Sequence, residues 1–340
     1  METVKILIGL LPVFLFLAAL VVMDSYKLIR FRSIAIAVLS GCAAAGLCFL
    51  FNRRLAGLLS MAGLPGMAGT KAFKILAPLI EETVKAAALV GWIRFRKVGF
   101  MVDAGIVGFA VGAGFALVEN IYYLQVLQDN NPLLWIVRGL GTAVMHGGTT
   151  SLFAILSKNL ADLRGRTGFW IFVPGWLLAA AVHCLFNSFI LPPVLMTLAQ
   201  VVVLSLLIAA VFSKSEGQLR DWMEAGMDSD ARLLRDIKSG NLSETRVGLY
   251  LHSLRDRFEG EVLADMLCYL RTHLELSLRA KGILLLRESG LETPADPDIL
   301  QRVDELRYLS KSIGKTGKFA LAPFMSRSDR DAWQLMLVKG

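Results

Sequence analysis

The sequence predicts an all-α protein: a polytopic transmembrane helical bundle of about seven spans, followed by a C-terminal soluble helical domain. Of its 340 residues, 55% are hydrophobic, which is more than a soluble globular domain usually carries. Apolar stretches close to the ~20 residues needed to cross a bilayer recur throughout the first 213 residues. From Lys214 onward, charges appear every three or four residues and no spanning stretch follows. We therefore predict a transmembrane domain over residues 1–213 and a cytoplasmic helical domain over 214–340.

The seven predicted spans follow one another with short connections. They cover residues 4–23, 33–51, 72–93, 103–127, 133–157, 168–190 and 193–213. The fourth span is rich in glycine, at Gly105, Gly108, Gly112 and Gly114. Small residues at such spacing let helix backbones approach closely, so we expect this span to be central in the bundle.

Basic residues in the short loops predict the orientation in the membrane. Three alternate loops carry them, namely Lys27, Arg30 and Arg32, then Arg94, Arg96 and Lys97, then Lys158, Arg164 and Arg166. With seven spans these loops share one side, which the positive-inside rule places in the cytoplasm. The N-terminus is then outside and the C-terminal domain cytoplasmic.

One loop disagrees with this orientation. Residues 52–71 carry Arg53, Arg54 and Lys71, yet the seven-span arrangement puts them outside. Either the basic residues of the other loops determine the orientation despite this loop, or this glycine-rich loop dips into the membrane interface.

The charge of the chain is concentrated in its membrane half. Residues 1–214 contain 17 Lys and Arg against 8 Asp and Glu, whereas the remainder contains 19 against 20. A nucleic-acid-binding protein would need a basic soluble surface, and the tail is nearly neutral. We therefore expect the lipid bilayer, and no nucleic acid, as the partner of the basic loops.

The tail shows helical periodicity. Apolar residues recur at helix spacing, as at Leu251, Leu254 and Phe258. Gly240, Gly260 and Gly290, with the prolines at 294 and 297, punctuate the stretch. We predict four or five helices, which offer a surface for a cytoplasmic regulator.

The third span contains two adjacent acids and a lysine, Glu81, Glu82 and Lys85. Each ionisable group at mid-bilayer costs ~2.5–3.5 kcal/mol on insertion scales, so such groups are usually functional. Glu81 and Lys85 are four residues apart on one helix face and could pair, and at least one of the two carboxylates is then free of the lysine. An interhelical ionic clamp is the alternative explanation.

Further polar residues occur in three later spans. Glu119 and Asn120 end the fourth span, Arg138 and His146 lie in the fifth, and His183 and Asn187 lie four residues apart in the sixth. Counted from the span ends, the acids, histidines and amides lie between the mid-plane and the outer leaflet. We expect them to converge around one polar cavity.

Two hydrolytic chemistries suit this set of residues. In the first, a glutamate takes a proton from water that attacks a peptide carbonyl, while histidine and asparagine stabilise the oxyanion. In the second, Glu82, His146 and His183 bind Zn²⁺ and another glutamate is the base. No His-Glu-x-x-His motif is present, so the metal-free chemistry is favoured and no cofactor is expected.

The order of these clusters resembles the PrsW family of prokaryotic intramembrane proteases, which is similar to CAAX prenyl endopeptidases and bacteriocin-processing membrane proteases. The resemblance rests on Glu-Glu-x-x-Lys at 81–85, Gly-Phe-Ala-x-x-Glu-Asn at 114–120, an Arg and a His-Gly-x-Thr-Thr-like segment within 138–150, and His-x-x-x-Asn at 183–187. It covers roughly residues 70–190.

The resemblance implies cleavage of a single-span, anti-sigma-factor-like membrane protein in a prokaryotic cytoplasmic membrane, and hence regulated proteolysis in signalling. Carried onto this chain, Glu81 and Glu82 supply the base and its orienting partner, and His146 assists water or substrate. His183 and Asn187 stabilise the oxyanion. Lys85, Glu119, Asn120 and Arg138 support the site. Some family members are described as metalloproteases, which keeps zinc open, and the long tail is a departure that leaves the substrate open.

Two other classes of function remain open from the residues alone. A proton-coupled transporter also uses intramembrane Glu, Lys and His, although no repeated halves are visible. A catalytically silent membrane scaffold or receptor would use the same residues only to hold its helices together.

Overall fold

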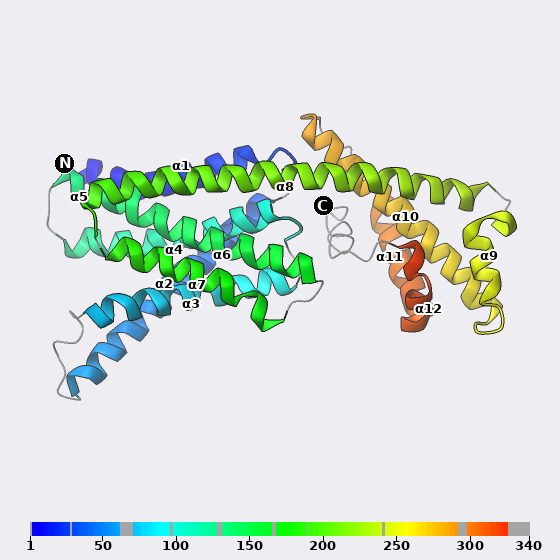
Figure 1. Cartoon of the computed structure of the whole chain (residues 1–340), viewed down its shortest axis with the longest axis horizontal. Helices are drawn as coiled ribbons and strands as arrows, with labels where there is room; N and C mark the ends of the chain where they lie inside the picture. The colour runs from blue at the N-terminus through cyan, green and yellow to red at the C-terminus, as the bar shows by residue number, and fades with distance from the viewer. Residues whose placement is uncertain are drawn as a thin grey trace. The chain divides into compact units, whose positions relative to one another are not determined.

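The computed structural model describes residues 2–27, 29–61, 71–95, 98–127, 131–164, 168–188, 190–239, 242–291 and 298–325. Within these residues every regular element is a helix, as predicted (Figure 1). The chain divides into two compact units, Met1–Glu216 and Gly217–Gly340. The first unit carries the predicted spans and the polar residues of the candidate site.

Seven helical segments of the first unit correspond to the seven predicted spans. They are α1 (Glu2–Met23), α2 (Phe31–Met61), α3 (Lys71–Arg94), α4 (Met101–Val126), α5–α6, α7 (Val173–Asn187) and the start of α8 (Pro193–Lys238). The fifth segment is composite: α5 (Pro132–Ile136) continues through a π-helical turn (Val137–Thr142) into α6 (Ala143–Arg164). A 3₁₀ turn (Phe169–Ile171) precedes α7.

Five of the described helices are long and apolar enough to cross a membrane. They are Glu2–Met23, Phe31–Leu55, Met101–Val126, Phe169–Asn187 and Pro193–Lys238. The segments α3 and α6 do not meet this criterion, and these two carry Glu81, Glu82, Lys85 and His146. Their polar side chains reduce the apolar character of the helix, which is the cost expected of a buried polar site.

One predicted boundary is wrong. The loop expected at 52–71 does not begin at 52, because α2 continues to Met61 and includes Arg53 and Arg54, while Lys71 begins α3. Residues 62–70 lie outside the described residues. Arginine and leucine are good helix formers, and no proline interrupts residues 52–61. The helix that carries the seventh predicted span continues beyond residue 213, to Lys238, and the end of the span within this helix stays a prediction.

The glycine-rich helix α4 is the centre of the first unit, as its sequence indicates. Sixteen of its 26 residues are buried. A Cβ atom on Gly112 would lie 2.2 Å from the carbonyl oxygen of His146 on α6, and one on Gly114 would lie 2.0 Å from that of Val38 on α2. Backbone therefore packs against backbone on both sides of α4, which fixes the position of His146 relative to α4.

The second unit contains the end of α8 together with α9 (Arg246–Ser253), α10 (Gly260–Glu288), α11 (Asp298–Ser312) and α12 (Gly314–Ala320). Its core is formed by Leu270, Leu274 and Leu284 of α10 with Val303 and Leu306 of α11. Two of the glycines predicted to mark helix boundaries do so. Gly260 begins α10, and Gly290 follows the end of α10 with a left-handed φ of 71°.

A pair of glycines on α2 tests the importance of close helix contact. A Cβ on Gly41 would lie 1.9 Å from the carbonyl oxygen of Val111, whereas a Cβ on Gly46 meets nothing within 4 Å. We predict that Gly41→Leu lowers the free energy of unfolding by about 1–3 kcal/mol or more through overpacking, and that Gly46→Leu leaves it unchanged. Circular dichroism during denaturation in detergent micelles measures both, and equal effects of the two variants would contradict the packing described.

Candidate functional site

The predicted polar residues meet at the centre of the first unit. Four helices contribute side chains to one connected cluster: Glu81, Glu82 and Lys85 from α3, Glu119 from α4, His146 from α6 and His183 from α7. Glu82, Lys85, His146 and His183 are all 2% exposed or less. The convergence that the sequence predicts is therefore present.

Glu82 is the most densely bonded residue of the cluster. Its Oε1 accepts a hydrogen bond from Lys85 Nζ at 2.6 Å and another from Thr149 Oγ1 at 3.4 Å, and it lies 2.7 Å from His183 Nδ1. Because an ionised carboxylate only accepts hydrogen bonds, we assign the imidazole proton to Nδ1 of His183. The other ring nitrogen, Nε2, then carries a free lone pair that faces Glu81.

The spacing of Glu81 and Lys85 allows a pair, but Lys85 pairs with Glu82, three residues before it. The Lys85 ammonium lies between Glu82 and His146 Nδ1, 3.1 Å from the latter, and 4.9 Å from the centroid of the Phe115 ring. These contacts draw the ammonium toward α4 and α6 and away from Glu81. Glu81 is consequently the less compensated acid, with an 18% exposed side chain and its Oε2 3.9 Å from His183 Nε2.

A second carboxylate holds the other histidine. His146 Nε2 lies 2.7 Å from Glu119 Oε2, and Glu119 Oε1 lies 3.3 Å from Arg138 Nη2. The two imidazole rings are perpendicular, with centroids 4.9 Å apart. Each histidine is thus oriented by its own glutamate, which fixes the direction of the ring and the nitrogen that carries the proton.

Arg138 connects this arrangement to the edge of the bundle. Its Nε donates to Asn120 Oδ1 at 3.2 Å, and Asn120 Nδ2 donates to the carbonyl oxygen of Gly9 on α1 at 2.8 Å. Arg138 belongs to the π-helical turn Val137–Thr142, a rare conformation that occurs frequently at functional sites. Asn120 and Arg138 therefore support the site from outside and do not border its centre.

One predicted residue is not brought into the cluster. Asn187 ends α7, one helical turn beyond His183, and forms no hydrogen bond to the cluster within the described part of the chain. Its expected contribution to oxyanion stabilisation stays a prediction.

Sequence reasoning missed one member of the cluster. Thr149 lies three residues after His146, on the same side of α6, and its hydroxyl reaches Glu82. Its spacing from His146 was the available signal. A threonine in an apolar span usually bonds its own helix backbone, so this spacing alone does not distinguish a site residue from an ordinary helical threonine.

Three residues are also placed as candidate metal ligands, and one of them differs from the expected set. Glu81, His146 and His183 each offer a ligand atom, and these atoms lie within 4.8 Å of one another, so Glu81 replaces Glu82. A carboxylate behind each histidine is the usual outer-shell arrangement of a metal site. The set therefore fits a divalent cation such as zinc in its donor chemistry, although the Lys85 ammonium already contacts His146 Nδ1.

A family model described as PrsW family intramembrane metalloprotease matches residues 30–212, more than half of the chain and every residue of the cluster. No curated protein matches, and no solved structure matches.

The buried ion pair between Glu82 and Lys85 leads to a prediction about stability. Lys85→Met leaves the buried Glu82 carboxylate without its cation, and we predict a loss of about 3–5 kcal/mol in the free energy of unfolding. Adding Glu82→Gln removes the uncompensated charge, so the double variant should be more stable than Lys85→Met alone. Lys158→Met is the matched control, because its partner Asp162 is 21% exposed. Denaturant titration of the purified proteins measures all three, and a smaller loss from Lys85→Met than from Lys158→Met would contradict this assignment.

Proposed function

Because the chain belongs to the PrsW family of intramembrane metalloproteases, we propose that it is an endopeptidase that cleaves a single-span membrane protein with a glutamate-activated water. The observation that carries the mechanism is the pair formed by Glu81 and His183. Glu81 Oε2 and His183 Nε2 lie 3.9 Å apart, on the side of the cluster where the Glu81 side chain is partly exposed. The remaining members of the cluster hold these two groups in place.

The gap between Glu81 and His183 is the proposed position of the attacking water. Two acceptor atoms 3.9 Å apart are close enough for one water molecule to hydrogen-bond to both at about 2.8 Å. Both water hydrogens then point to protein acceptors, so an oxygen lone pair is directed toward the substrate. This orientation is what a general-base mechanism needs.

The proposed reaction transfers one proton twice. The water oxygen bonds to the peptide carbonyl carbon as one water proton moves to Glu81, which gives a tetrahedral oxyanion. The C–N bond then breaks, and Glu81 returns the proton to the leaving nitrogen. The products are one chain ending in a carboxylic acid and one beginning with an amine, and Glu81 is ionised again. The second water proton then passes from the new acid to the amine, which leaves a carboxylate and an ammonium group.

The other cluster residues position these groups. Glu82 holds His183 through Nδ1, Lys85 neutralises Glu82, and Glu119 holds His146. The side-chain amide of Asn187, one turn beyond His183, is the proposed donor to the oxyanion. One such donor typically contributes 10²–10³ in rate.

A neighbouring cavity supports a membrane-embedded substrate. A space of about 540 Å³ borders α3, α6 and α7, and its lining is mainly apolar and aromatic: Thr83, Ala86, Ala87, Val90, Arg94, Phe153, Phe169, Phe172, Val173 and Trp176. Its lining includes Thr83, the residue after Glu82. An apolar segment of a substrate fits this lining, because no polar partner is required along most of it.

The proposed topology follows the basic loops of the sequence. Seven segments cross a prokaryotic cytoplasmic membrane, the N-terminus is outside, and the second unit is cytoplasmic. An anti-sigma-factor-like protein is the proposed substrate, which makes the reaction a step in regulated proteolysis, and the second unit is the proposed site of a cytoplasmic regulator.

A metal-dependent form of the reaction is the second candidate, favoured by the Glu81, His146 and His183 triad. When bound there, zinc would supply Lewis acidity toward the water and the carbonyl. Glu82 and Glu119 would then fix the ligating histidines from behind. We favour the metal-free form because the ammonium of Lys85, 3.1 Å from His146 Nδ1, opposes a second cation at the same nitrogen.

We predict that Glu81→Gln reduces cleavage at least 100-fold while the protein remains folded and inserted, because the amide cannot accept the water proton. Comparative membrane proteomics of cells producing the wild type or the variant should show one single-span protein that loses its trimmed form. Asp162→Asn is the matched control, an acid of α6 paired with Lys158. Identical trimmed forms with wild type and Glu81→Gln would refute the protease, and would leave a transporter or scaffold.

Chelation separates the two forms of the mechanism. We predict that purified protein in detergent, treated with a zinc chelator and then freed of it, cleaves the substrate identified by that proteomic comparison within about twofold of the untreated rate. The metal-free base needs no ion, so the rate constant is unchanged. A loss of activity that added Zn²⁺ restores would establish the metal-dependent form.

A further inference from the structure

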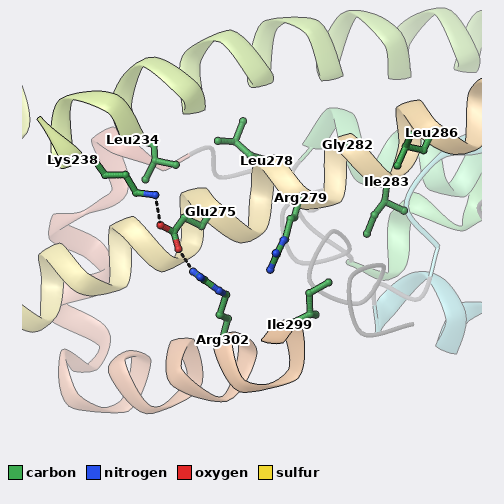
Figure 2. A pocket seen from close by; sticks show the side chains of 10 residues that line it. All are labelled: Leu234, Lys238, Glu275, Leu278, Arg279, Gly282, Ile283, Leu286, Ile299 and Arg302. Carbon is green, nitrogen blue, oxygen red and sulfur yellow. Dashed lines mark hydrogen bonds and ion pairs between the residues drawn. The ribbon is translucent and has the colours of Figure 1, made fainter. Parts of the chain in front are cut away.

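The second unit contains a cavity that the proposed proteolysis does not use. It has a volume of about 600 Å³ and is formed by α8, α10 and α11 (Figure 2). Its lining consists of Leu234, Lys238, Glu275, Leu278, Arg279, Gly282, Ile283, Leu286, Ile299 and Arg302. Small-molecule sites in proteins typically measure about 300–1,000 Å³, so the space suits a ligand of that class.

One end of the cavity is cationic. Figure 2 shows the Glu275 carboxylate between Lys238 and Arg302, with the Arg279 side chain extending toward α11. Lys238 Nζ lies 2.8 Å from Glu275 Oε1, and Arg302 pairs with its other oxygen. Three cationic side chains thus line the cavity with one carboxylate, which leaves a net charge of +2 in the lining.

The charge of Glu275 is itself well defined. Burial tends to raise its pKa, but the hydrogen bond and charge of Lys238 and the charge of Arg302 outweigh this effect, and the pKa is lowered. Glu275 therefore stays ionised at neutral pH. Its single negative charge is shared by Lys238, Arg302 and, outside the lining, Arg271, so a bound anion would offset the excess of positive charge here.

The rest of the lining is aliphatic. Leu234 of α8, Leu278, Ile283 and Leu286 of α10, and Ile299 of α11 form this part. Among the ten lining residues none is aromatic, so the cavity offers no ring on which a nucleobase would stack. An aliphatic chain matches this surface better than a flat aromatic ligand does.

Gly282 keeps the space open. It lies within the 29-residue helix α10, where glycine is less favourable than alanine. Close packing does not explain it, because a Cβ at this position meets no heavy atom within 4 Å in the described structure, and its φ is not left-handed. A side chain larger than hydrogen would project into the cavity that Gly282 lines.

We propose that this cavity binds a single-chain lipid anion, a long aliphatic chain that ends in a carboxylate or a phosphate. The head group lies at Lys238, Arg279 and Arg302, and the chain follows α10 past Gly282 toward Leu286. The stretch from Glu275 to Leu286 is about 16 Å long at 1.5 Å per residue, which covers most of an extended sixteen-carbon acyl chain. This binding is independent of the proposed peptide hydrolysis.

Photo-crosslinking of the full-length protein in phospholipid nanodiscs tests the proposal. The probe is hexadecanoate with a diazirine near its methyl end, and peptide mapping locates the adducts. We expect saturable labelling of peptides that contain residues 275–286, 234–238 or 299–302, with competition by unlabelled hexadecanoate or by hexadecyl phosphate. Competition by one and not the other identifies the head group. Adducts confined to residues 1–216 would overturn the proposal.

Two pairs of comparisons make the test specific. Gly282→Phe fills the cavity and should reduce labelling of these peptides at least tenfold, whereas Gly217→Phe, also without heavy atoms within 4 Å of its Cβ position, should not. A diazirine-bearing hexadecanol, which lacks the charge, should label at least tenfold less than the carboxylate. Thermal unfolding of both variants verifies that they fold. Wild-type labelling of Gly282→Phe, or equal labelling by the alcohol, would refute the lipid-anion site.

Discussion

The buried pair between Glu82 and Lys85 is the interaction on which the rest of the site depends. Both groups are withdrawn from solvent, at 2% and 0% exposure of their side chains, which is costly for separate charges. The pair is tolerable because each charge has further partners: His183 and Thr149 for the carboxylate, and His146 for the ammonium. The contacts that satisfy these two charges are the same contacts that orient both imidazole rings.

The central helix of the bundle, α4, has glycines where it contacts α6 and α2, so almost no side-chain volume separates these helices. Gly112 and Gly114 bring α6 and α2 against the backbone of α4. His146 is consequently anchored through its own main chain, and its ring is free to be oriented by Glu119. Glycines therefore pack the helices together, while polar residues at neighbouring positions of the same helices form the hydrogen bonds of the site.

Much of this arrangement could be predicted from the sequence, because isolated polar residues stand out in apolar spans. The helical class, the central position of α4 and the meeting of Glu82 with His183 follow from composition, glycine spacing and depth. The choice of Glu82 over Glu81 as partner of Lys85 does not, since both spacings allow a pair and the decision depends on His146 and Phe115 across the bundle. The extension of α2 to Met61 was missed because two arginines were read as a loop.

Hydrogen bonds and one ion pair, between Glu119 and Arg138, connect His146 through Asn120 to the carbonyl of Gly9, in a helix that lies outside the family match at residues 30–212. A Cβ on Gly139, in the π-helical turn, would lie 1.9 Å from the carbonyl oxygen of Ile8, so the same helix also abuts that turn directly. The first helix is thus tied to the residues that support the polar cluster from outside. A shortened protein that begins at residue 30, where the family match begins, would lack Gly9, and the Asn120 amide would keep only its longer hydrogen bond of 3.4 Å to the carbonyl oxygen of Arg138.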